Sequence, residues 1–358
     1  MNYQKKLQAI LSEAVQKGAS DVHIVAGHAP IIRQTRTLLE LEQDKLSALD
    51  AKGLAFELMD QEQEQRFLKE KEIDFAYEFD NNIRFRVNIF FQMNRVSAAL
   101  RLIISKIRSL EELNLPNTLH KFIEARHGLV LITGASSQGK STTLAALIDG
   151  INHQRKEHII TIEDPIEYVF QDDKSIIQQR EVYQDALSFA KALRATLRED
   201  PDVIMVGEMR DLETIATAIT AAETGHLVFA TLHTNSASQT IHRAIDVFPP
   251  HQQDQIRAQL ANSLLGVVSQ RLLPTLKKEF VPVCEIMFAN SAIKNLIREN
   301  KIHEIPSVID TSADEGMMTL NKHLAELILK KEIDKQLAFS YSLDPADLKA
   351  RVGESRLK

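Results

Sequence analysis

The sequence contains a single cysteine, Cys284, among its 358 residues. This excludes an intramolecular disulfide and any zinc module built on two or four cysteines. Glycine and proline are also scarce, with 12 and 10 residues, which excludes collagen-like and low-complexity architectures. No uncharged apolar run reaches the ~18 residues of a membrane-spanning helix, and no apolar core of a signal peptide follows Met1. These absences predict a protein of a reducing compartment.

The rest of the composition is that of a globular protein, with 44% hydrophobic and 26% charged residues. The length suggests about two domains of ~150 residues each. Lysine and arginine number 43 against 49 aspartate and glutamate residues, which makes the formal net charge −6. This balance argues against nucleic acid as the main partner, although a local basic face is compatible with it.

The first part of the chain, residues 1–104, is predicted to be an α+β domain. Leu7, Ile10, Leu11 and Ala14 fall on one face of a helix over residues 1–17. Residues 83–92 alternate in character, so Arg84 and Arg86 share one face of a strand. The remaining expected elements are a helix over 51–70, strands over 22–25, 75–79 and 96–104, and a turn at Asn81–Asn82.

The second part alternates apolar strands with helices, the pattern of a largely parallel α/β sheet. We interpret residues 105–118 as a linker and residues 119–358 as one domain, whose region from about 251 onward is expected to be a helical bundle. The expected strands are 129–133, 158–162, 203–206 and 227–232, and the expected helices are 140–152, 185–199 and 212–223.

A phosphate-binding motif lies at the first of these strand-to-helix junctions. The segment matches G-x-x-x-x-G-K-[ST] in full, between an apolar strand and a helix. Such a loop points N–H groups at phosphate oxygens, where the helix terminus adds a favourable field. Lys140 can reach the β- and γ-phosphates of ATP, and the Ser141 hydroxyl can bind Mg²⁺; the alternative is a chance Gly-Lys-Ser turn. The candidate nucleotide-binding residues are Gly134, Ala135, Ser136, Ser137, Gln138, Gly139, Lys140, Ser141 and Thr142.

Two glutamates follow buried strands and are candidates for the acids of a nucleotide-hydrolysing site. Glu163 ends the strand 158–162, and Glu208 comes shortly after 203–206. Ligands of open α/β sheets bind at the carboxyl ends of strands, and hydrolysis needs one carboxylate near the metal and another at the attacking water. A solvated turn carboxylate is the alternative for each. Gly207 stands where many nucleoside triphosphatases carry an aspartate.

Two histidines border the strand 227–232. His226 precedes it and His233 follows it, and either could sense a phosphate or serve only in the structure. The two are seven residues apart, roughly 23 Å if extended, so one nucleotide would not touch both in one subunit unless the chain bends. His233, at the carboxyl end, is the better candidate.

Together these segments resemble the secretion ATPase superfamily, and within it the PilT-like ATPases that retract type IV pili. The early stretches 18–23 and 84–88 resemble the PAS-like N-terminal domain of that family. Residues 292–299, A-I-K-N-L-I-R-E, resemble a retraction-specific helix with the apolar positions Ala292, Ile293, Leu296 and Ile297. The matching stretches of the nucleotide-binding domain are 134–141, 160–167, 179–182, 197–204, 207–214 and 224–234.

The resemblance implies a cytoplasmic homohexamer at the inner-membrane base of the pilus. Its implied partners are a platform protein of that base and a second retraction ATPase. It implies a RecA-like domain that hydrolyses ATP with Mg²⁺. By this analogy Glu208 is the general base, Glu163 the second acid and a metal ligand with Ser141, and His233 a catalytic residue, while His226 contacts the nucleotide. Arg86 and Arg101 resemble the arginines that reach the phosphates, where spread negative charge favours cations.

Two departures from the resemblance leave its details open. The family loop usually reads G-P-T-G-S-G-K-S, but Ala135 replaces the proline and Ser137 the inner glycine. If that position requires a positive φ, Ser137 is strained and turnover is slowed. The C-terminal stretch 343–352 is also compatible with accessory PilU-like ATPases.

Two competing functions also remain compatible with the sequence. One is a nucleotide-sensing partner with weak hydrolysis, because the altered loop could reduce catalysis. The second is a RecA-like nucleic-acid motor, which the net acidic charge disfavours. Assembly and type II secretion ATPases typically carry four cysteines, which this chain lacks.

Overall fold

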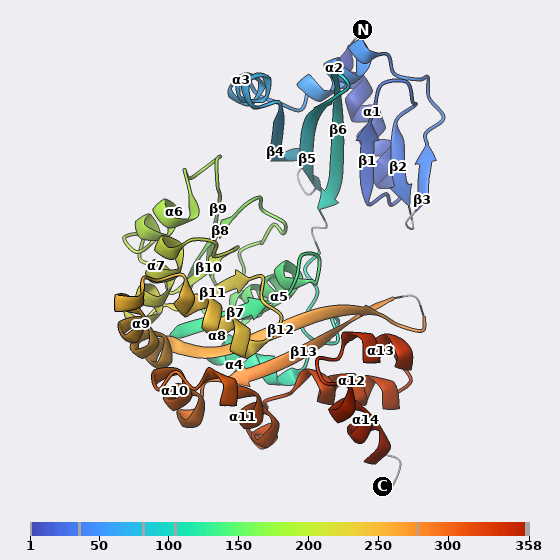
Figure 1. The fold of residues 1–358 in the computed structure, drawn as a ribbon. Helices are drawn as coiled ribbons and strands as arrows, with labels where there is room; N and C mark the ends of the chain where they lie inside the picture. Colours follow the sequence, from blue (N-terminus) through green and yellow to red (C-terminus); the bar gives the residue numbers. More distant parts are fainter. Residues whose placement is uncertain (1, 35–36, 81–82, 104–105, 278, 355–358) are drawn as a thin grey trace. The chain divides into compact units, whose positions relative to one another are not determined.

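A computed structural model describes residues 2–34, 37–80, 83–103, 106–277 and 279–354 (Figure 1). The chain forms two compact units. The first contains residues 1–106 and 165–169, and the second contains residues 107–164 and 170–358. The turn expected at Asn81–Asn82 and the expected domain end at Ile104 lie outside the described residues.

In its described residues the first unit is a six-stranded antiparallel sheet with three α-helices, which is an α+β fold. Its strand order is β3-β2-β1-β6-β5-β4. The helix α1 buries the four apolar residues that the sequence pattern selects. The elements are α1 (Tyr3–Gln16), β1 (Asp21–Ile24), β2 (Ile31–Gln34), β3 (Thr37–Glu40), α2 (Ala48–Phe56), α3 (Gln61–Glu70), β4 (Glu72–Asp80), β5 (Ile83–Gln92) and β6 (Arg95–Ile103).

The single helix expected over residues 51–70 is two helices in the structure. The side chain of Ser47 caps α2, and the side chain of Asp60 accepts from the Gln63 N–H and so caps α3. Both caps are reciprocal, because Asp50 and Gln63 return a bond to the cap backbone. A second capping signal inside a polar stretch therefore ends the first helix and starts another.

The second unit is built on a seven-stranded sheet of order β13-β12-β7-β11-β10-β8-β9 (Figure 1). Its strands are parallel except β13, and all residues of β7 and β11 are buried, as in strands covered on both faces. The strands are β7 (Gly128–Thr133), β8 (His158–Glu163), β9 (Ile176–Glu181), β10 (Val203–Val206), β11 (Leu227–Leu232), β12 (Leu264–Pro274) and β13 (Phe280–Phe288). The helices up to β12 are α4 (His120–Glu124), α5 (Lys140–Gln154), α6 (Phe189–Thr196), α7 (Leu212–Glu223), α8 (Ala237–Asp246) and α9 (Pro250–Ser263).

The helical bundle expected from about residue 251 onward is contradicted in part, because two long strands stand between α9 and the later helices. The strands β12 and β13 form an antiparallel hairpin, and β12 pairs in parallel with β7. Because residues 266–270 of β12 are buried in one run, the strand lacks the alternation that marks a half-exposed strand. No helix within the described residues is both long and apolar enough to cross a membrane. Five α-helices in the described residues follow the hairpin. They are α10 (Ser291–Arg298), α11 (Ile305–Thr311), α12 (Leu320–Leu329), α13 (Lys335–Tyr341) and α14 (Pro345–Glu354).

The segment interpreted as a linker belongs, from Ile107 onward, to the second unit. Leu110 and Leu115 are buried, and the Leu115 N–H donates to the Leu110 carbonyl. Ser109 and Glu112 exchange side-chain to backbone hydrogen bonds of 3.2 and 2.9 Å, a reciprocal capping pattern. The 107–118 segment is therefore an ordered turn that buries two leucines, although most of its residues are polar or charged.

Candidate nucleotide-binding site

The carboxyl ends of the parallel strands bring most of the predicted site residues to one edge of the sheet. The loop after β7 is the phosphate-binding motif, Glu163 ends β8, and Glu208 and His233 follow β10 and β11. In the sheet order β7-β11-β10-β8, the end of each of these strands lies one strand away from the end of the next. This is the edge at which open α/β sheets bind ligands.

The backbone of the phosphate-binding loop depends on three residues with positive φ. Gly134 has φ of 146° and Gly139, which caps α5, has φ of 79°. Ser137 has φ of 62°, a left-handed conformation that costs a side-chain-bearing residue roughly 1–2 kcal/mol. The condition under which strain is expected at Ser137 is therefore met.

The side chain of Lys140 lies within this loop. It is 9% exposed, and its Nζ donates hydrogen bonds of 2.9 Å to the carbonyls of Gly134 and Ala135. The ammonium group is thus held at the loop by main-chain oxygens. The Lys140 ammonium is therefore positioned to bind a phosphate at the loop without a large movement of its side chain.

Glu208 is paired with an arginine and a histidine. Its carboxylate contacts Arg210 at 2.5 Å and His233 Nε2 at 3.3 Å, and its side chain is only 13% exposed. The Thr231 side chain of β11 binds the backbone just after β10, because its Oγ1 donates to the Gly207 carbonyl at 2.5 Å. The structure thus brings together Glu208 and His233, which are 25 residues apart in sequence.

Glu163 is buried and held in place by neighbouring polar side chains. Its Oε1 accepts from the Thr161 hydroxyl at 2.6 Å and from Gln179 Nε2 at 3.1 Å. The oxygen of the Gln179 amide in turn accepts from the Phe170 N–H at 2.9 Å. Both ends of the Gln179 amide are used, and this fixes the orientation of the Glu163 carboxylate.

The residues fit a magnesium ion that arrives with a nucleotide better than a resident metal. No group of three or more histidine, cysteine, aspartate or glutamate side chains in the described part of the chain could hold a metal. Mg²⁺ usually keeps several waters and binds through one or two protein ligands plus substrate phosphates. The Ser141 hydroxyl and the Glu163 carboxylate are donors of the right chemistry, but β11 and β10 lie between their strands.

His226 lies at the opposite end of β11 from the phosphate-binding loop. Leu227, the next residue, pairs with Gly128 at the start of β7, and the loop begins only after Thr133. Six strand residues span about 20 Å. The His226 Nδ1 is 2.9 Å from the Ala221 carbonyl at the end of α7. Within one copy, therefore, His226 is not brought to the loop.

Arg86 and Arg101 lie in the first unit and face each other across the β5–β6 ladder. Like charges directly opposite each other repel, and each guanidinium has its own carboxylate. Arg86 contacts Asp74 at 2.7 Å and Arg101 contacts Asp21 at 3.1 Å. The Arg101 side chain is 70% exposed. The alternation of residues 83–92 predicts the two faces of β5 correctly: Arg84 and Arg86 are half-buried, whereas Phe85 and Val87 are buried.

A cavity of about 520 Å³ adjoins the phosphate-binding loop and includes residues that the sequence does not mark as functional. The 108–115 segment lines it, although it reads as a linker. So does the β12–β13 hairpin, which reads as helical. In the 108–115 segment, the apolar residues Leu110 and Leu115 were the sequence signal that could have indicated an ordered segment. The lining includes Asn114, Thr142, Gln270, Leu272, Phe280 and Pro282.

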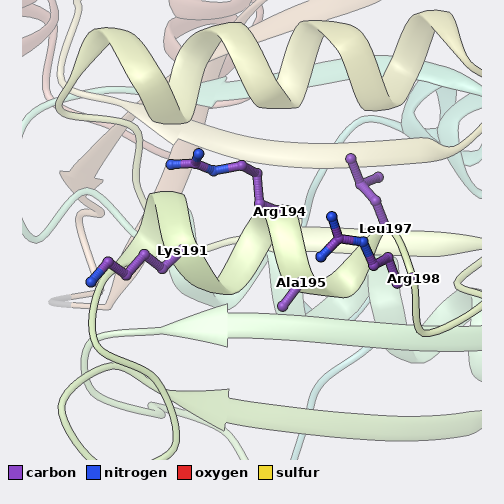
Figure 2. Close-up of a pocket in the computed structure, with 5 residues that line it drawn as sticks. All are labelled: Lys191, Arg194, Ala195, Leu197 and Arg198. Atoms are coloured by element: carbon purple, nitrogen blue, oxygen red, sulfur yellow. The ribbon is translucent and has the colours of Figure 1, made fainter.

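A second hollow, of about 550 Å³, lies along α6 and the turn after it (Figure 2). Lys191, Arg194 and Arg198 supply its charge, and Ala195 and Leu197 its apolar lining. Arg194 forms an ion pair with Glu213 of α7. All of these lining residues come from α6 and the turn after it. Lys191 is therefore a lysine of the second unit that does not belong to the phosphate-binding loop.

The fold and the loop together define the class of the protein. A mostly parallel sheet with a complete G-x-x-x-x-G-K-S loop after a central strand, and acids at the ends of neighbouring strands, defines a P-loop NTPase with a RecA-like domain. The family model described as "Type II/IV secretion system protein" matches residues 2–336. The chain belongs to this family.

Similar proteins cover nearly the whole chain. The type IV pilus retraction ATPase PilT of Pseudomonas aeruginosa is 44% identical over 92% of this chain and 96% of its own length. The type IV pilus ATPase PilU of the same organism is 38% identical over 97% of this chain and 91% of its own. A crystal structure of the pilus retraction motor PilT with bound ADP has a TM-score of 0.90 and 45% identity, and the match covers 96% of this chain and 98% of that one.

Proposed function

We propose that this protein hydrolyses ATP and that the energy drives retraction of a type IV pilus. The observation that carries the proposal is the complete phosphate-binding loop after β7, with the Lys140 ammonium held inside it. The names of its relatives support the pilus as the load: PilT is a retraction ATPase, and a 47% identical protein of Neisseria gonorrhoeae is a twitching motility protein.

The nucleotide lies with its phosphates on residues 134–142 and its base and ribose in the adjoining cavity. Lys140 exchanges its two carbonyl partners for phosphate oxygens, since a charged acceptor gives the stronger hydrogen bond. The cavity of about 520 Å³ is of the size of ordinary ligand pockets. When bound, Mg²⁺ would neutralise charge on the phosphates. Ser141 would be its donor from the loop, and Glu163, separated from the loop by two strands, would act through one of the waters that Mg²⁺ keeps.

In this proposal Glu208 orients or deprotonates the attacking water. Its carboxylate is held by His233, so the imidazole positions the base and senses the charge that hydrolysis changes. Arg86 and Arg101 come from a neighbouring copy and stabilise the spread negative charge of the transition state. His226 is left out of the nucleotide site of its own copy.

The active assembly in this proposal is a homohexamer at the cytoplasmic side of the inner-membrane pilus base. Its partners are the platform protein of that base and a second retraction ATPase. The net charge of −6 supports a protein partner over nucleic acid.

A second candidate function is that of an accessory retraction ATPase. It is favoured by the match to PilU, which spans 348 residues against 329 for PilT. The strained Ser137 backbone suits weak hydrolysis or nucleotide sensing. Turnover by the purified protein alone distinguishes these functions: a motor hydrolyses ATP unaided, whereas an accessory protein does so only with its partner.

Replacing Lys140 with alanine tests the proposal. We expect Lys140→Ala to abolish ATP binding in calorimetry and turnover in a phosphate-release assay. Lys191→Ala is the control, since it removes a lysine of the same unit outside the loop. Unchanged binding and turnover in Lys140→Ala would refute the nucleotide site, and normal twitching of cells carrying it would refute the role in retraction.

A further inference from the structure

A buried glutamine of β12 connects the phosphate-binding loop with the first turn of α5. Gln270 is 2% exposed, and both ends of its carboxamide are used. Its Nε2 donates to the main-chain carbonyl of Gln138 at 2.8 Å, and its Oε1 accepts from the Thr143 hydroxyl at 2.7 Å. One planar group thus sets the spacing between the loop and the helix.

Gln138 binds β12 in return. β12 pairs with β7 as far as Ser269 and Thr133, where β7 ends and the loop begins. Beyond that point the Leu272 N–H donates to the side-chain oxygen of Gln138 at 2.7 Å. Gln138 therefore supplies the acceptor at the point where β7 has ended.

The loop approaches β12 too closely to move independently of it. A Cβ atom at Gly134 would lie 2.4 Å from the Gln270 carbonyl oxygen, and one at Gly139 would lie 2.9 Å from its Nε2. Both motif glycines therefore meet a packing requirement of β12 in addition to their phosphate-binding role. A change in the Gln270 side chain acts directly on the backbone of the loop.

We propose that Gln270 is a positioning residue of the nucleotide site, an inference that rests on the proposed function. In a trans peptide the C=O of one residue and the N–H of the next point in opposite directions. By binding the Gln138 carbonyl toward β12, Gln270 turns the Gly139 N–H the other way, toward the phosphates. Without this bond the peptide can rotate and present its oxygen to the phosphate, which repels it.

Nucleotide affinity of the full-length protein tests this role. Gln270→Met keeps the length of the side chain but loses both hydrogen bonds. We expect it to raise the Kd for Mg²⁺–ADP and Mg²⁺–ATP about tenfold in calorimetry, equal to about 1.4 kcal/mol. Gln253→Met is the matched control, because Gln253 also donates from Nε2 to a backbone carbonyl, that of Phe248 at 3.0 Å. We expect its Kd to be unchanged.

Two further variants keep the outcome decisive. Thr143→Val keeps the shape of the side chain but removes the hydroxyl that holds the Gln270 carboxamide, and it should raise the Kd about threefold; it decides the matter if Gln270→Met does not fold. Lys140→Ala reports on the site itself. If Lys140→Ala weakens binding while the folded Gln270→Met, or else Thr143→Val, binds as tightly as the control, the positioning role is overturned. If Lys140→Ala binds normally, the proposed function fails instead.

Discussion

The strain at Ser137 is confined to one residue and can be removed by one substitution. A left-handed conformation is free for glycine and costly for serine, while glycine loses more entropy on folding. We expect Ser137→Gly to stabilise the protein by about 0.5–1 kcal/mol in denaturant unfolding. Ser136→Gly, whose φ is not positive, should destabilise it by a similar amount. A destabilised Ser137→Gly, like the control variant, would show that Ser137 is not strained.

The proposed role of Glu208 as the general base can likewise be tested with one substitution. Glu208→Gln keeps the shape of the side chain but cannot accept a proton from water. We expect kcat to fall at least about a hundredfold while KM for ATP changes little, because a base acts in the transition state. Glu213→Gln on α7 should have no such effect. A rise in KM alone would make Glu208 a binding residue and Glu163 the preferred base.

At the scale of elements, a buried histidine makes the packing of α12 on β13 sensitive to pH. His323 Nδ1 accepts the Cys284 N–H at 3.0 Å, and burial lowers the pKa of the imidazole to about 4. Its unfolded pKa is about 6.5, so below that pH the unfolded chain binds the additional proton. Stability is therefore complete above about pH 6.5 and is lost as the pH falls toward 4, by up to about 3 kcal/mol.

A glutamine can accept the same N–H without titrating. We expect His323→Gln to reduce the loss of thermal stability between about pH 7 and pH 4.5, measured as the unfolding midpoint. His303→Gln, at an exposed histidine, should leave the pH profile of the parent protein unchanged. Equal profiles for both variants would exclude His323 as the titrating group.

The helix α10 has a buried face that packs and a polar face available for coupling. Ile293 and Ile297 are buried and Leu296 is half-buried, as expected, but Ala292 is exposed because the packed face is narrower than the apolar pattern. On the polar face the Arg298 guanidinium donates to Asn262 of α9 at 2.9 Å.

We expect alanine at Lys294, Asn295 and Arg298 together to cost little stability, about 0.5 kcal/mol per site at most. If α10 couples hydrolysis to the pilus, this variant keeps its ATPase rate but fails to support twitching. Normal twitching would show that the polar face is only solvated surface.

At the scale of the whole molecule, the proposal requires more than one copy. We expect Arg86→Ala and Arg101→Ala each to impair hydrolysis while both units stay folded. Mixing either with Lys140→Ala subunits should restore part of the ATPase rate, because each subunit then supplies what its neighbour lacks. An unchanged rate at every mixing ratio would contradict a role across a subunit interface.

Local sequence was sufficient for four of the six parallel strands that the structure describes, for the phosphate-binding loop and for the acids at the strand ends, but not for β9 and β12. Residues 203–206, 212–223 and 227–232 are the predicted elements to the residue. The reason is physical: buried parallel strands are continuous apolar runs, and a loop that binds phosphate needs glycines at defined spacing. These signals lie within a few residues of one another.

Only the tertiary structure decided what meets the loop from a distance. Gln270 and Gln138 are separated by 132 residues, and nothing in the stretch around Gln270 distinguishes a buried strand from a helix. Its contact depends on the order of strands and on the register of β12 against β7. The same holds for the pairing of Glu208 with His233, for the distance of His226 from the loop and for the 108–115 wall of the cavity. Register and strand order arise from the packing of the entire core, and a local pattern of residues does not encode them.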